Sequence, residues 1–463
     1  MIQSVNTSST TSSEQQTLTS SSKTIAFGKT IGALFLLAVA FPFNLAIVAV
    51  SLLWGSLSWP FRQRVRVTEP KTVLVSGGKM TKALQIARSM HRAGHHVILV
   101  ETHKYKLSGH RFSNAIAKFY TVPAPRGDGK DYALALAEIV EREGVDLYIP
   151  VCSPVASYYD SLAKSVLPCE VFHFDAEVTR MLDDKYAFAE AARSLGLPVP
   201  KSFKITDPKQ VLNFDFSQET RPYILKSIPY DSVRRLDLTK LPCKTPEATA
   251  RFVSSLPITS DKPWIMQEFI SGKELCTHST LRDGHHRLYC CSDSSAFQVN
   301  YEHRDCSQIL GWVTRFAAAH QLTGQMSLDF IQAEDGTAYA IECNPRTHSA
   351  ITTFYNHPGV ADAYLGKNNL DKPLEPLPIS KPTYWIYHEI WRLITSKTIQ
   401  QFWHQVKTIY RGTDAIYDLY DPLPFLTVPH WQISLLLLKN LRLLKSWIRI
   451  DFNIGKLVEI GGD

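Results

Sequence analysis

The sequence predicts an α/β fold with a doubly wound parallel sheet, followed by α+β parts that contain antiparallel strands. Between residues 70 and 180, short apolar strands alternate with helical segments, which is typical of a parallel sheet covered by helices. Further along, residues 326–352 read as a β-hairpin that turns around Asp335 and Gly336. The chain has 463 residues, 44% hydrophobic and 20% charged, which is enough for two or three domains and excludes a disordered or fibrous chain.

The charge balance and the cysteines exclude two further classes of protein. A formal net charge of +7 over this length is too dilute for a nucleic-acid-binding protein, which concentrates its basic surface. The eight cysteines show neither a C-x-x-C pair nor a Cys/His cluster with zinc spacing. We therefore expect reduced thiols in a cytosolic protein without a structural zinc.

The N-terminal region begins with a polar tail and continues with an apolar segment. Residues 1–29 are rich in Ser and Thr and are expected to form a disordered tail. Residues 30–59 carry no charge and are long enough to cross a bilayer, with Pro42 allowing either a kinked helix or a shallow hairpin. The run is too long for a signal peptide, and a buried core helix remains an alternative. Cations on both flanks leave the orientation open: Lys23, Lys29, Arg62, Arg64 and Arg66.

A second segment suited to membranes lies near the C-terminus. In residues 431–450 four cations recur at intervals of three and four, which places them on one helical face: Lys439, Arg442, Lys445 and Arg449. A basic amphipathic helix with aromatic ends suits an anionic membrane surface. A helix docked on the domain with a solvated basic edge is the alternative. The basic helix and the apolar segment together lead us to expect a cytoplasmic catalytic body associated with a membrane.

The first predicted strand–turn–helix unit contains a candidate anion site. An apolar strand over 72–76 is followed by Gly77 and Gly78 and then by a helix over 79–93. Backbone N–H groups at such a turn can bind an anion at the helix N-terminus, so Ser76, Gly77 and Gly78 are candidate substrate ligands. The turn matches neither the P-loop nor the dinucleotide pattern, and a simple tight turn is an equal alternative.

Two segments of the middle region point to nucleotide chemistry. Lys226 interrupts the apolar strand YILKSI, and a charge there needs a partner such as a nucleotide phosphate, unless the lysine snorkels to solvent. In residues 263–284, strand residues lead into Gln267 and Glu268, then Phe269, Ile270 and Glu274. Such a segment can act as a hinge whose backbone reads an adenine edge while a carboxylate binds ribose hydroxyls.

The hairpin over 326–352 carries the strongest group of polar residues. Glu342 and Asn344 are two residues apart and share one strand face, and cross-strand pairing can bring Asp329 onto it. Two carboxylates and an amide oxygen are ligands suited to Mg²⁺ that bridges phosphates. Arg346 follows and can stabilise charge on a transferring phosphoryl group. A solvated hairpin has little need to gather these groups.

Taken in order, these residues resemble the ATP-grasp superfamily of carboxylate–amine ligases. The resemblance runs through Lys185, Lys226, the pair Gln267 and Glu268, Asp329, and ECNPR over 342–346. Stretches such as LVSGGKMTKALQIARS (74–89) and KPTYWIYHEIWRL (381–393) are similar to the branch of the superfamily that acts in mycosporine biosynthesis. The similarity covers the chain from about residue 70 and includes the apolar segment in position.

The resemblance implies an ADP-forming C–N ligase that joins glycine to the cyclohexenone 4-deoxygadusol through a phosphorylated enol. It implies ATP as co-substrate, Mg²⁺ (with Mn²⁺ as an alternative) and a homodimer. Carried over by position, Lys185 and Lys226 contact the ATP phosphates, Gln267 to Ile270 hold the adenine with Glu268, and Glu274 holds the ribose. Asp329, Glu342 and Asn344 bind the metal, Arg346 acts at the phosphoryl group, and His348 and Ser349 lie near the second substrate.

One departure concerns the phosphate-covering loop. Many superfamily members have a glycine-rich loop after the strand lysine, whereas residues 227–235 read SIPYDSVRR and contain no glycine.

Two alternative functions remain open: a ligase for another amino acid and another carbonyl or carboxyl acceptor, and a membrane-tethered nucleotide-binding protein without catalysis. The predicted division is a tail (1–29), an apolar segment (30–59), an N-terminal domain (70–180), an ATP-lid domain (181–275), a catalytic domain with an antiparallel sheet (276–380) and an extension with the basic helix (381–463).

Overall fold

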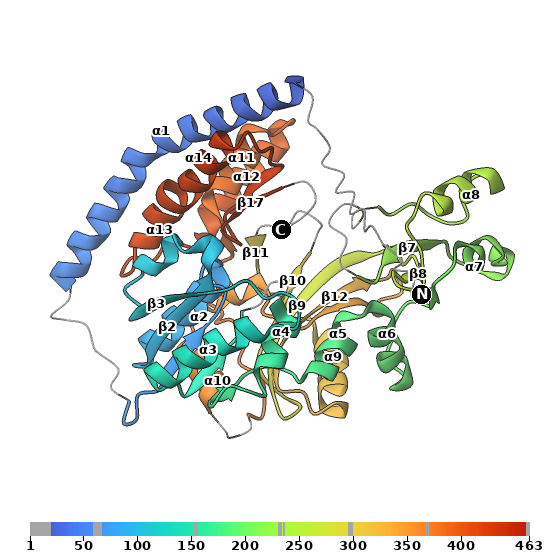
Figure 1. Cartoon of the computed structure of the whole chain (residues 1–463), viewed down its shortest axis with the longest axis horizontal. Coiled ribbons are helices and arrows are strands. Elements are labelled where there is room, and N and C mark those ends of the chain that lie inside the picture. Colours follow the sequence, from blue (N-terminus) through green and yellow to red (C-terminus); the bar gives the residue numbers. More distant parts are fainter. Residues whose placement is uncertain are drawn as a thin grey trace, which may run out of the picture.

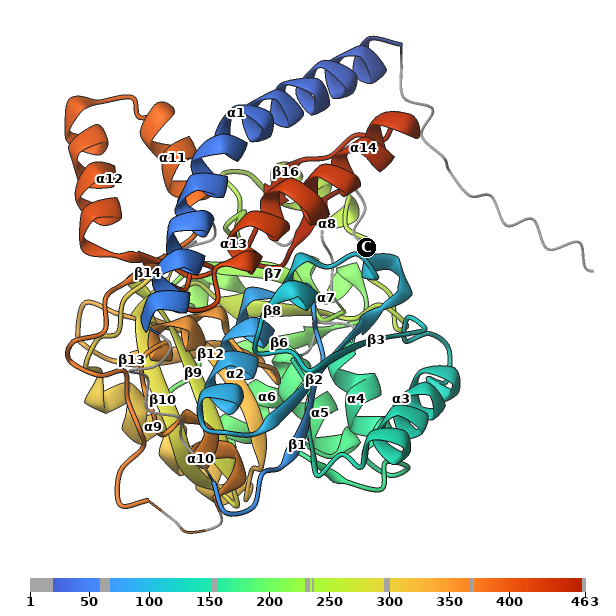
Figure 2. The same ribbon diagram turned by 90° about the vertical axis from the view of Figure 1, so that its left-hand side faces the viewer.

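The computed structural model describes residues 20–58, 67–151, 156–229, 234, 237–294, 300–366, 368 and 370–459. Within these residues the strands form five sheets. Figures 1 and 2 show the sheets in one body, with a long N-terminal helix lying along the outside of the C-terminal helices.

The first sheet is parallel and has helices on both faces, as the sequence predicts. Its strand order is β3-β2-β1-β4-β5. Val73 and Val75 of β1 pack in one core cluster with the helix α2, whereas Leu74 packs with α3 on the other face, as the two-residue period of a strand requires. The elements are β1 (Thr72–Val75), α2 (Thr81–Arg92), β2 (His96–Thr102), β3 (Lys118–Val122), α3 (Lys130–Glu143), β4 (Leu147–Ile149), α4 (Ala156–Ala163), β5 (Glu170–Val171) and α5 (Ala176–Asp183).

The middle of the chain forms a small antiparallel sheet in the order β6-β8-β7. Its own core includes Leu225, Trp264 and Met266. Ahead of it, the helix α6 begins where the Asp184 carboxylate accepts hydrogen bonds from the amides of Tyr186 and Ala187. The elements are α6 (Lys185–Ser194), β6 (Ser202–Ile205), α7 (Pro208–Leu212), β7 (Tyr223–Ser227), α8 (Pro246–Ser254) and β8 (Trp264–Glu268).

After the small sheet, the chain forms a larger antiparallel sheet in the order β10-β9-β12-β13. Helix α9 covers one face, where Trp312 and Phe316 pack with Met326 and Phe330. The predicted boundary at 275/276 falls inside the continuous strand β9, which pairs with both β10 and β12. The elements are β9 (Lys273–Arg282), β10 (His285–Asp293), α9 (Ser307–Ala319), β12 (Gly324–Gln332), β13 (Ala338–Asn344), η5 (Ser349–Phe354) and α10 (Val360–Leu365).

The C-terminal region returns to the first sheet and adds helices beside it. A three-stranded sheet has the order β11-β14-β15, and β16 pairs with β17. The elements are β11 (Asn300–Tyr301), β14 (Thr383–Tyr384), α11 (Ile386–Ile394), α12 (Ile399–Arg411), β15 (Thr413–Asp414), α13 (Leu423–Thr427), the π-helical turn η6 (Val428–Ile433), α14 (Ser434–Arg442), β16 (Arg449–Asp451) and β17 (Lys456–Val458).

The predicted basic amphipathic helix over 431–450 is wrong in extent. Helix α14 ends at Arg442, and Leu444 adopts a positive φ of 50°. Lys439 and Arg442 lie on the helix, whereas Lys445 follows it and Arg449 lies on β16. The four cations therefore do not share one helical face. The chain leaves the helix to bring Trp447 against the N-terminal helix, a contact 417 residues away that local spacing does not reveal.

The N-terminal apolar segment is one long helix, α1 (Ser20–Ser58), which continues through Pro42. The shallow hairpin is therefore wrong, as is the disordered tail for residues 20–29; residues 1–19 and Trp59 lie outside the described residues. Residues 26–58 are long and apolar enough to cross a membrane, and their most apolar 18-residue window has a mean hydropathy of 2.5, which alone is weak evidence for a span. Only 17% of the most apolar window is buried, so α1 is not a core helix.

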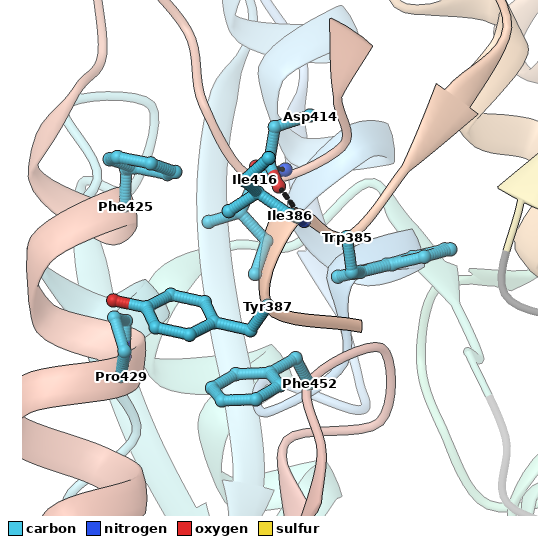
Figure 3. A pocket seen from close by; sticks show the side chains of 8 residues that line it. All are labelled: Trp385, Ile386, Tyr387, Asp414, Ile416, Phe425, Pro429 and Phe452. Carbon is cyan, nitrogen blue, oxygen red and sulfur yellow. Dashed lines mark hydrogen bonds between the residues drawn. The ribbon is translucent and has the colours of Figure 1, made fainter. Parts of the chain in front are cut away.

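A small cavity lies between α11 and the C-terminal turns (Figure 3). Tyr387 stacks on Phe452 with ring centroids 4.7 Å apart, and Asp414 Oδ2 accepts a hydrogen bond from the Ile386 amide at 2.7 Å. The cavity measures about 10 Å³, room for at most one water. Its volume is too small for a substrate.

Candidate functional site

The predicted acidic residues meet on the hairpin formed by β12 and β13. Asp329 pairs directly with Glu342 in the antiparallel register, which brings the two side chains to the same face. Asn344 lies beside them, with its Nδ2 atom 3.5 Å from Asp329 Oδ2. All three side chains keep part of their surface exposed, so a ligand can reach them. The predicted grouping of Asp329, Glu342 and Asn344 is therefore observed.

Two lysines from other elements approach the same carboxylates. Lys185 is the first residue of α6, and its Nζ lies 3.6 Å from Glu342 Oε1. Lys226 lies within β7, paired with Ile265 of β8, and its charge acts on Glu342 and Asp329. Arg346, two residues after β13, acts on the same two carboxylates. The hairpin thus brings together the cations and anions that the sequence analysis selected.

Burial and mutual repulsion shape the ionisation of this cluster. Burial raises the pKa of Asp329 to about 7, and the negative charges of Glu342 and Glu274 add to the increase. Burial would also raise the pKa of Glu342, but Lys185, Lys226 and Arg346 together lower it. Burial lowers the pKa of Lys226, and Glu342 opposes that decrease. Because the two carboxylates repel each other and have lost hydration, additional positive charge stabilises their ionised forms.

The donor set fits a magnesium ion by its chemistry. Two carboxylates and one amide oxygen are the hard oxygen ligands that Mg²⁺ prefers, with the remaining positions supplied by phosphates and water. Among the described residues, no group of three or more His, Cys, Asp or Glu side chains could hold a metal ion. The seven cysteines in the described part of the chain are all free.

The predicted hinge lies at the end of β8, next to the hairpin. Gln267 is buried, and its Nε2 donates to the Ile341 carbonyl at 3.4 Å, which links β8 to β13. The amides of Glu268 and Phe269 donate to the carbonyls of Lys201 and Pro222. Only the backbone carbonyls and the Ile270 amide are therefore candidates for contact with an adenine edge.

The two hinge carboxylates differ in their surroundings. Glu268 forms an ion pair with Arg221 at 3.4 Å and accepts a hydrogen bond from the Lys201 amide, so its side chain is engaged at the sheet edge. Glu274 accepts a hydrogen bond from Ser294 Oγ at 3.2 Å, and its charge acts on Asp329 and Lys226. Glu274 therefore belongs to the charged cluster, and Glu268 lies at its border.

Two of the three backbone amides in the turn at Ser76, Gly77 and Gly78 donate to carbonyls of the same sheet, that of Ser76 to Ile149 at 3.2 Å. The amide of Gly78 donates to the Val100 carbonyl at 3.1 Å, and Ser76 Oγ accepts from the Val151 amide at 3.0 Å. Gly77 has a φ of 72°, and a Cβ there would lie 2.4 Å from the Val151 carbonyl oxygen. The turn is a tight connection closed by its own chain, which fits the alternative of a simple turn; a role for Ser76, Gly77 and Gly78 in substrate binding stays a prediction.

At the start of helix α2, backbone amides are also bonded to groups of the protein. The Lys79 amide donates to Glu101 Oε2 at 3.0 Å, and the Lys79 ammonium lies 3.4 Å from Glu101 Oε1. The amide of Thr81 donates to the Asn453 carbonyl at 2.9 Å. A carboxylate and a carbonyl of the protein thus occupy the positions that an anion would take.

His348 and Ser349 lie in a second polar cluster beyond Arg346. His348 Nδ1 accepts from the Ala350 amide at 3.2 Å, and burial lowers the pKa of His348 to about 3. The ring is therefore neutral with its proton on Nε2, which makes it a hydrogen-bond donor. Ser349 Oγ exchanges hydrogen bonds with the Asn453 side chain at 2.7–3.0 Å. Tyr301 meets His348 edge to face, with ring centroids 5.2 Å apart.

Sequence reasoning missed several residues of these clusters. Asp183 precedes the α6 cap, and the charges of Arg346 and Lys185 act on its carboxyl group. Lys82 is buried in α2, where its ammonium donates to the Thr347 carbonyl at 2.6 Å. His278 on β9 accepts from the His348 amide at 3.3 Å. Lys82 falls inside the stretch LVSGGKMTKALQIARS and Asp183 lies two residues before Lys185, whereas nothing local marks His278 or Tyr301. Of the glycine-free segment 227–235, residues 230–233 and 235 lie outside the described residues.

Comparisons with known proteins agree with this architecture. No protein-family model matches the chain, and no curated protein matches its sequence. An ADP complex of purK, an N5-carboxyaminoimidazole ribonucleotide synthetase, is 12% identical with a TM-score of 0.54, covering 75% of this chain and 98% of that chain. The N5-carboxyaminoimidazole synthetase of Staphylococcus aureus, complexed with ADP, is 12% identical with a TM-score of 0.51, covering 69% and 82%. An L-amino acid ligase from Bacillus licheniformis is 14% identical with a TM-score of 0.46, covering 64% and 70%.

At such identities the similarity concerns the fold. A parallel sheet with helices on both faces, a small antiparallel sheet and a larger antiparallel sheet follow one another along the chain. The chain has the ATP-grasp fold, preceded by a long apolar helix.

Proposed function

We propose that this protein is an ATP-dependent, ADP-forming ligase that makes a C–N bond. The observation that supports this most strongly is the convergence of Lys185, Lys226, Asp329, Glu342 and Arg346 at one hairpin face. Structural stability alone does not call for two lysines, an arginine and two carboxylates gathered at a partly exposed face, because such charges lose hydration. Phosphate groups and a divalent cation would complete the balance of charge.

ATP would bind with its phosphates between the two lysines and the hairpin. Lys185 and Lys226 would hold phosphate oxygens, and Asp329, Glu342 and Asn344 would hold Mg²⁺, with Mn²⁺ as an alternative. When bound, the metal would neutralise charge on the transferring phosphoryl group. The adenine would contact the backbone of residues 268–270, and the ribose would contact Glu274. In this arrangement the sheet β6-β8-β7 and its helices form the part that covers the nucleotide.

The substrates are proposed from the resemblance in sequence. They are glycine and the cyclohexenone 4-deoxygadusol, and the product is mycosporine-glycine. The second polar cluster, with His348, Ser349 and Tyr301, lies next to Arg346 and would hold the ring. The neutral His348 supplies an N–H donor and Tyr301 an aromatic face, which suit a ring that carries oxygen substituents.

The proposed chemistry balances in two steps. An enol oxygen of the ring, which loses its proton to solvent, attacks the γ-phosphorus of ATP; a new P–O bond forms, and the bond to ADP breaks with its electron pair leaving on ADP. The amine nitrogen of glycine then bonds to the ring carbon that carries the phosphate. The C–O bond breaks, phosphate leaves with the electron pair, and the nitrogen loses a proton to solvent. Arg346 stabilises the phosphoryl group during both steps.

Release of ADP tests this proposal when each substrate is varied in turn. We expect ADP formation to require both glycine and 4-deoxygadusol. In Asp329→Asn and Glu342→Gln, ADP formation should fall at least a hundredfold, whereas the matched control Glu334→Gln, in the exposed turn of the same hairpin, should retain full activity. Turnover only with a different amine or acceptor would refute the proposed substrates but would still support a ligase. Tight binding of Mg-ATP without turnover for any amine would refute the ligase.

A further inference from the structure

Helix α1 is attached to the body along one narrow seam. The buried residues Thr30, Leu37, Asn44 and Ser51 recur every seven residues, which places them on one side of the helix. Three of these four residues are polar. An apolar helix that only crossed a bilayer would have no need of such a polar seam.

Each polar residue of the seam has a partner in the C-terminal region. Trp447 Nε1 donates to Thr30 Oγ1 at 3.0 Å. Asn44 Nδ2 donates to the Tyr387 hydroxyl at 2.6 Å. Ser51 Oγ lies 2.9 Å from the Tyr417 hydroxyl. These contacts fix the beginning, middle and end of the helix to the body.

The N-terminal end of the seam also holds a charge. The Lys29 ammonium donates to the carbonyls of Trp447 and Ile448 at 3.0 and 2.7 Å and lies 4.1 Å from the centre of the Trp447 ring. These carbonyls lie beyond the end of α14, and they hold the cation against the body. The orientation of α1 along the body is therefore defined by directional bonds as well as by apolar contact.

The docked geometry excludes a transmembrane orientation. At 1.5 Å per residue the segment from Thr30 to Ser51 is about 32 Å long. The hydrocarbon core of a bilayer is about 30 Å thick. If α1 crossed the bilayer while docked, its partners along this length would cross with it, together with the polar elements that carry them: Trp447, Tyr387 and Tyr417. Burying that polar body in lipid would be prohibitively costly.

The side of α1 away from the seam is apolar and exposed. It carries large hydrophobic side chains from end to end, with exposures that reach 68% for Phe43 and 74% for Leu57. Helices α11 and α12 add further exposed aromatic and aliphatic residues: Trp391, Ile394, Ile399, Phe402, Trp403 and Tyr410. Figure 2 shows α1 and the pair α11 and α12 projecting from the same side of the body. Exposed apolar surface on this scale marks an interaction site.

The charges around this surface favour one partner. Residues 20–66 and 423–450 contain no Asp or Glu, and residues 386–411 contain only Glu389, whose side chain is fully buried against Asn300 and Arg392. Exposed cations border the apolar side chains, among them Lys397, Lys407 and Arg411. Apolar and aromatic residues ringed by cations without carboxylates complement an anionic lipid surface.

From these observations we propose that α1, α11 and α12 form a lipid-facing surface that inserts into one leaflet of an anionic membrane, with α1 lying flat. The protein is monotopic: the seam faces the body, the exposed side of α1 enters the acyl region, and the cations meet the headgroups. This proposal keeps the membrane association that the sequence predicts. It replaces a helix over residues 30–59 that crosses the bilayer with one that lies in a single leaflet. This inference is independent of the ligase proposal.

Two measurements on the full chain test it. In the first, the protein is floated with phosphatidylcholine vesicles that contain or lack phosphatidylglycerol. We expect binding to the anionic vesicles, weakened at least tenfold in Trp391→Ser/Trp403→Ser and unchanged in the control Leu134→Ser, an exposed leucine on α3. In the second, protease is added outside sealed vesicles. Full accessibility of an N-terminal tag and of the body supports the flat orientation.

Three results would overturn the inference. A protease-protected fragment that contains the N-terminal tag would show that α1 crosses the bilayer. Equal vesicle binding by the double variant and the parent would remove α11 and α12 from the surface. A stable dimer that buries this surface and binds no vesicles would identify a second copy of the chain as the partner.

Discussion

The substitution Asp421→Asn should destabilise the protein through a single buried ion pair. Arg88 of α2 and Asp421, just before α13, have side chains 4% and 6% exposed, and Arg88 Nε lies 2.7 Å from Asp421 Oδ2. The same carboxylate accepts from Ser113 Oγ at 2.6 Å and from the Asn114 amide at 2.8 Å. Removing its charge takes from the buried guanidinium the carboxylate that is hydrogen-bonded to it, and leaves only the more distant Asp414 and Asp418 to act on its charge. Breaking such a pair costs about 3–5 kcal/mol of unfolding free energy.

Urea unfolding, followed by tryptophan fluorescence, measures this cost from the transition midpoint and slope. The double variant Arg88→Met/Asp421→Leu should recover at least about 2 kcal/mol relative to the sum of its single variants, because it leaves no unpaired charge. The exposed pair Lys130–Asp128 provides a control, and Asp128→Asn should leave the midpoint unchanged. A loss below about 1 kcal/mol for Asp421→Asn, or additive single and double variants, would refute the reasoning.

Three further predictions address the turn at Gly77, the buried His110 and the nucleotide site. Gly77→Ala should lower the free energy of unfolding by about 1–3 kcal/mol, because φ is +72° and its Cβ would meet the Val151 carbonyl; an unchanged melting temperature would contradict this. Burial lowers the pKa of His110 to about 3, so the unfolded chain binds the proton more tightly and stability falls as pH drops below about 6.5. In His110→Gln this loss between pH 4 and 6 should be smaller by about 1.4 kcal/mol per pH unit, and equal slopes would contradict it. Lys226→Met should raise the KM for ATP at least tenfold, and Lys204→Met, exposed on the same sheet, should leave it unchanged; equal effects would remove Lys226 from the site.

The acidic part of the site could be predicted because strand geometry is local. In a hairpin with a short turn, the two-residue period and the register decide which side chains share a face, and these can be read from 326–352 alone. Asp329, Glu342 and Asn344 therefore came together as expected. Lys226 also stood out, because a charge inside an apolar strand is conspicuous wherever the strand lies.

Contacts between distant segments could not be predicted in this way. The turn at Gly77 resembles an anion site in sequence, and only the fold brings Glu101 and Asn453 onto the neighbouring amides. Helix α14 ends where Trp447 packs against α1, although LRLLKS contains no residue that breaks a helix. His278 and Tyr301 reach His348 from separate strands. In each case the deciding partner lies far away in sequence.

The seam of α1 joins this helix to elements that are synthesised hundreds of residues later. The Thr30–Trp447 contact spans 417 residues. At the usual rate of translation these residues take roughly 20–80 s to add. For nearly all of that interval α13, α14 and Trp447 do not yet exist. The most apolar segment of the protein therefore spends nearly the whole of its synthesis without intramolecular cover, and its first encounters are with lipid or chaperone rather than with its own body.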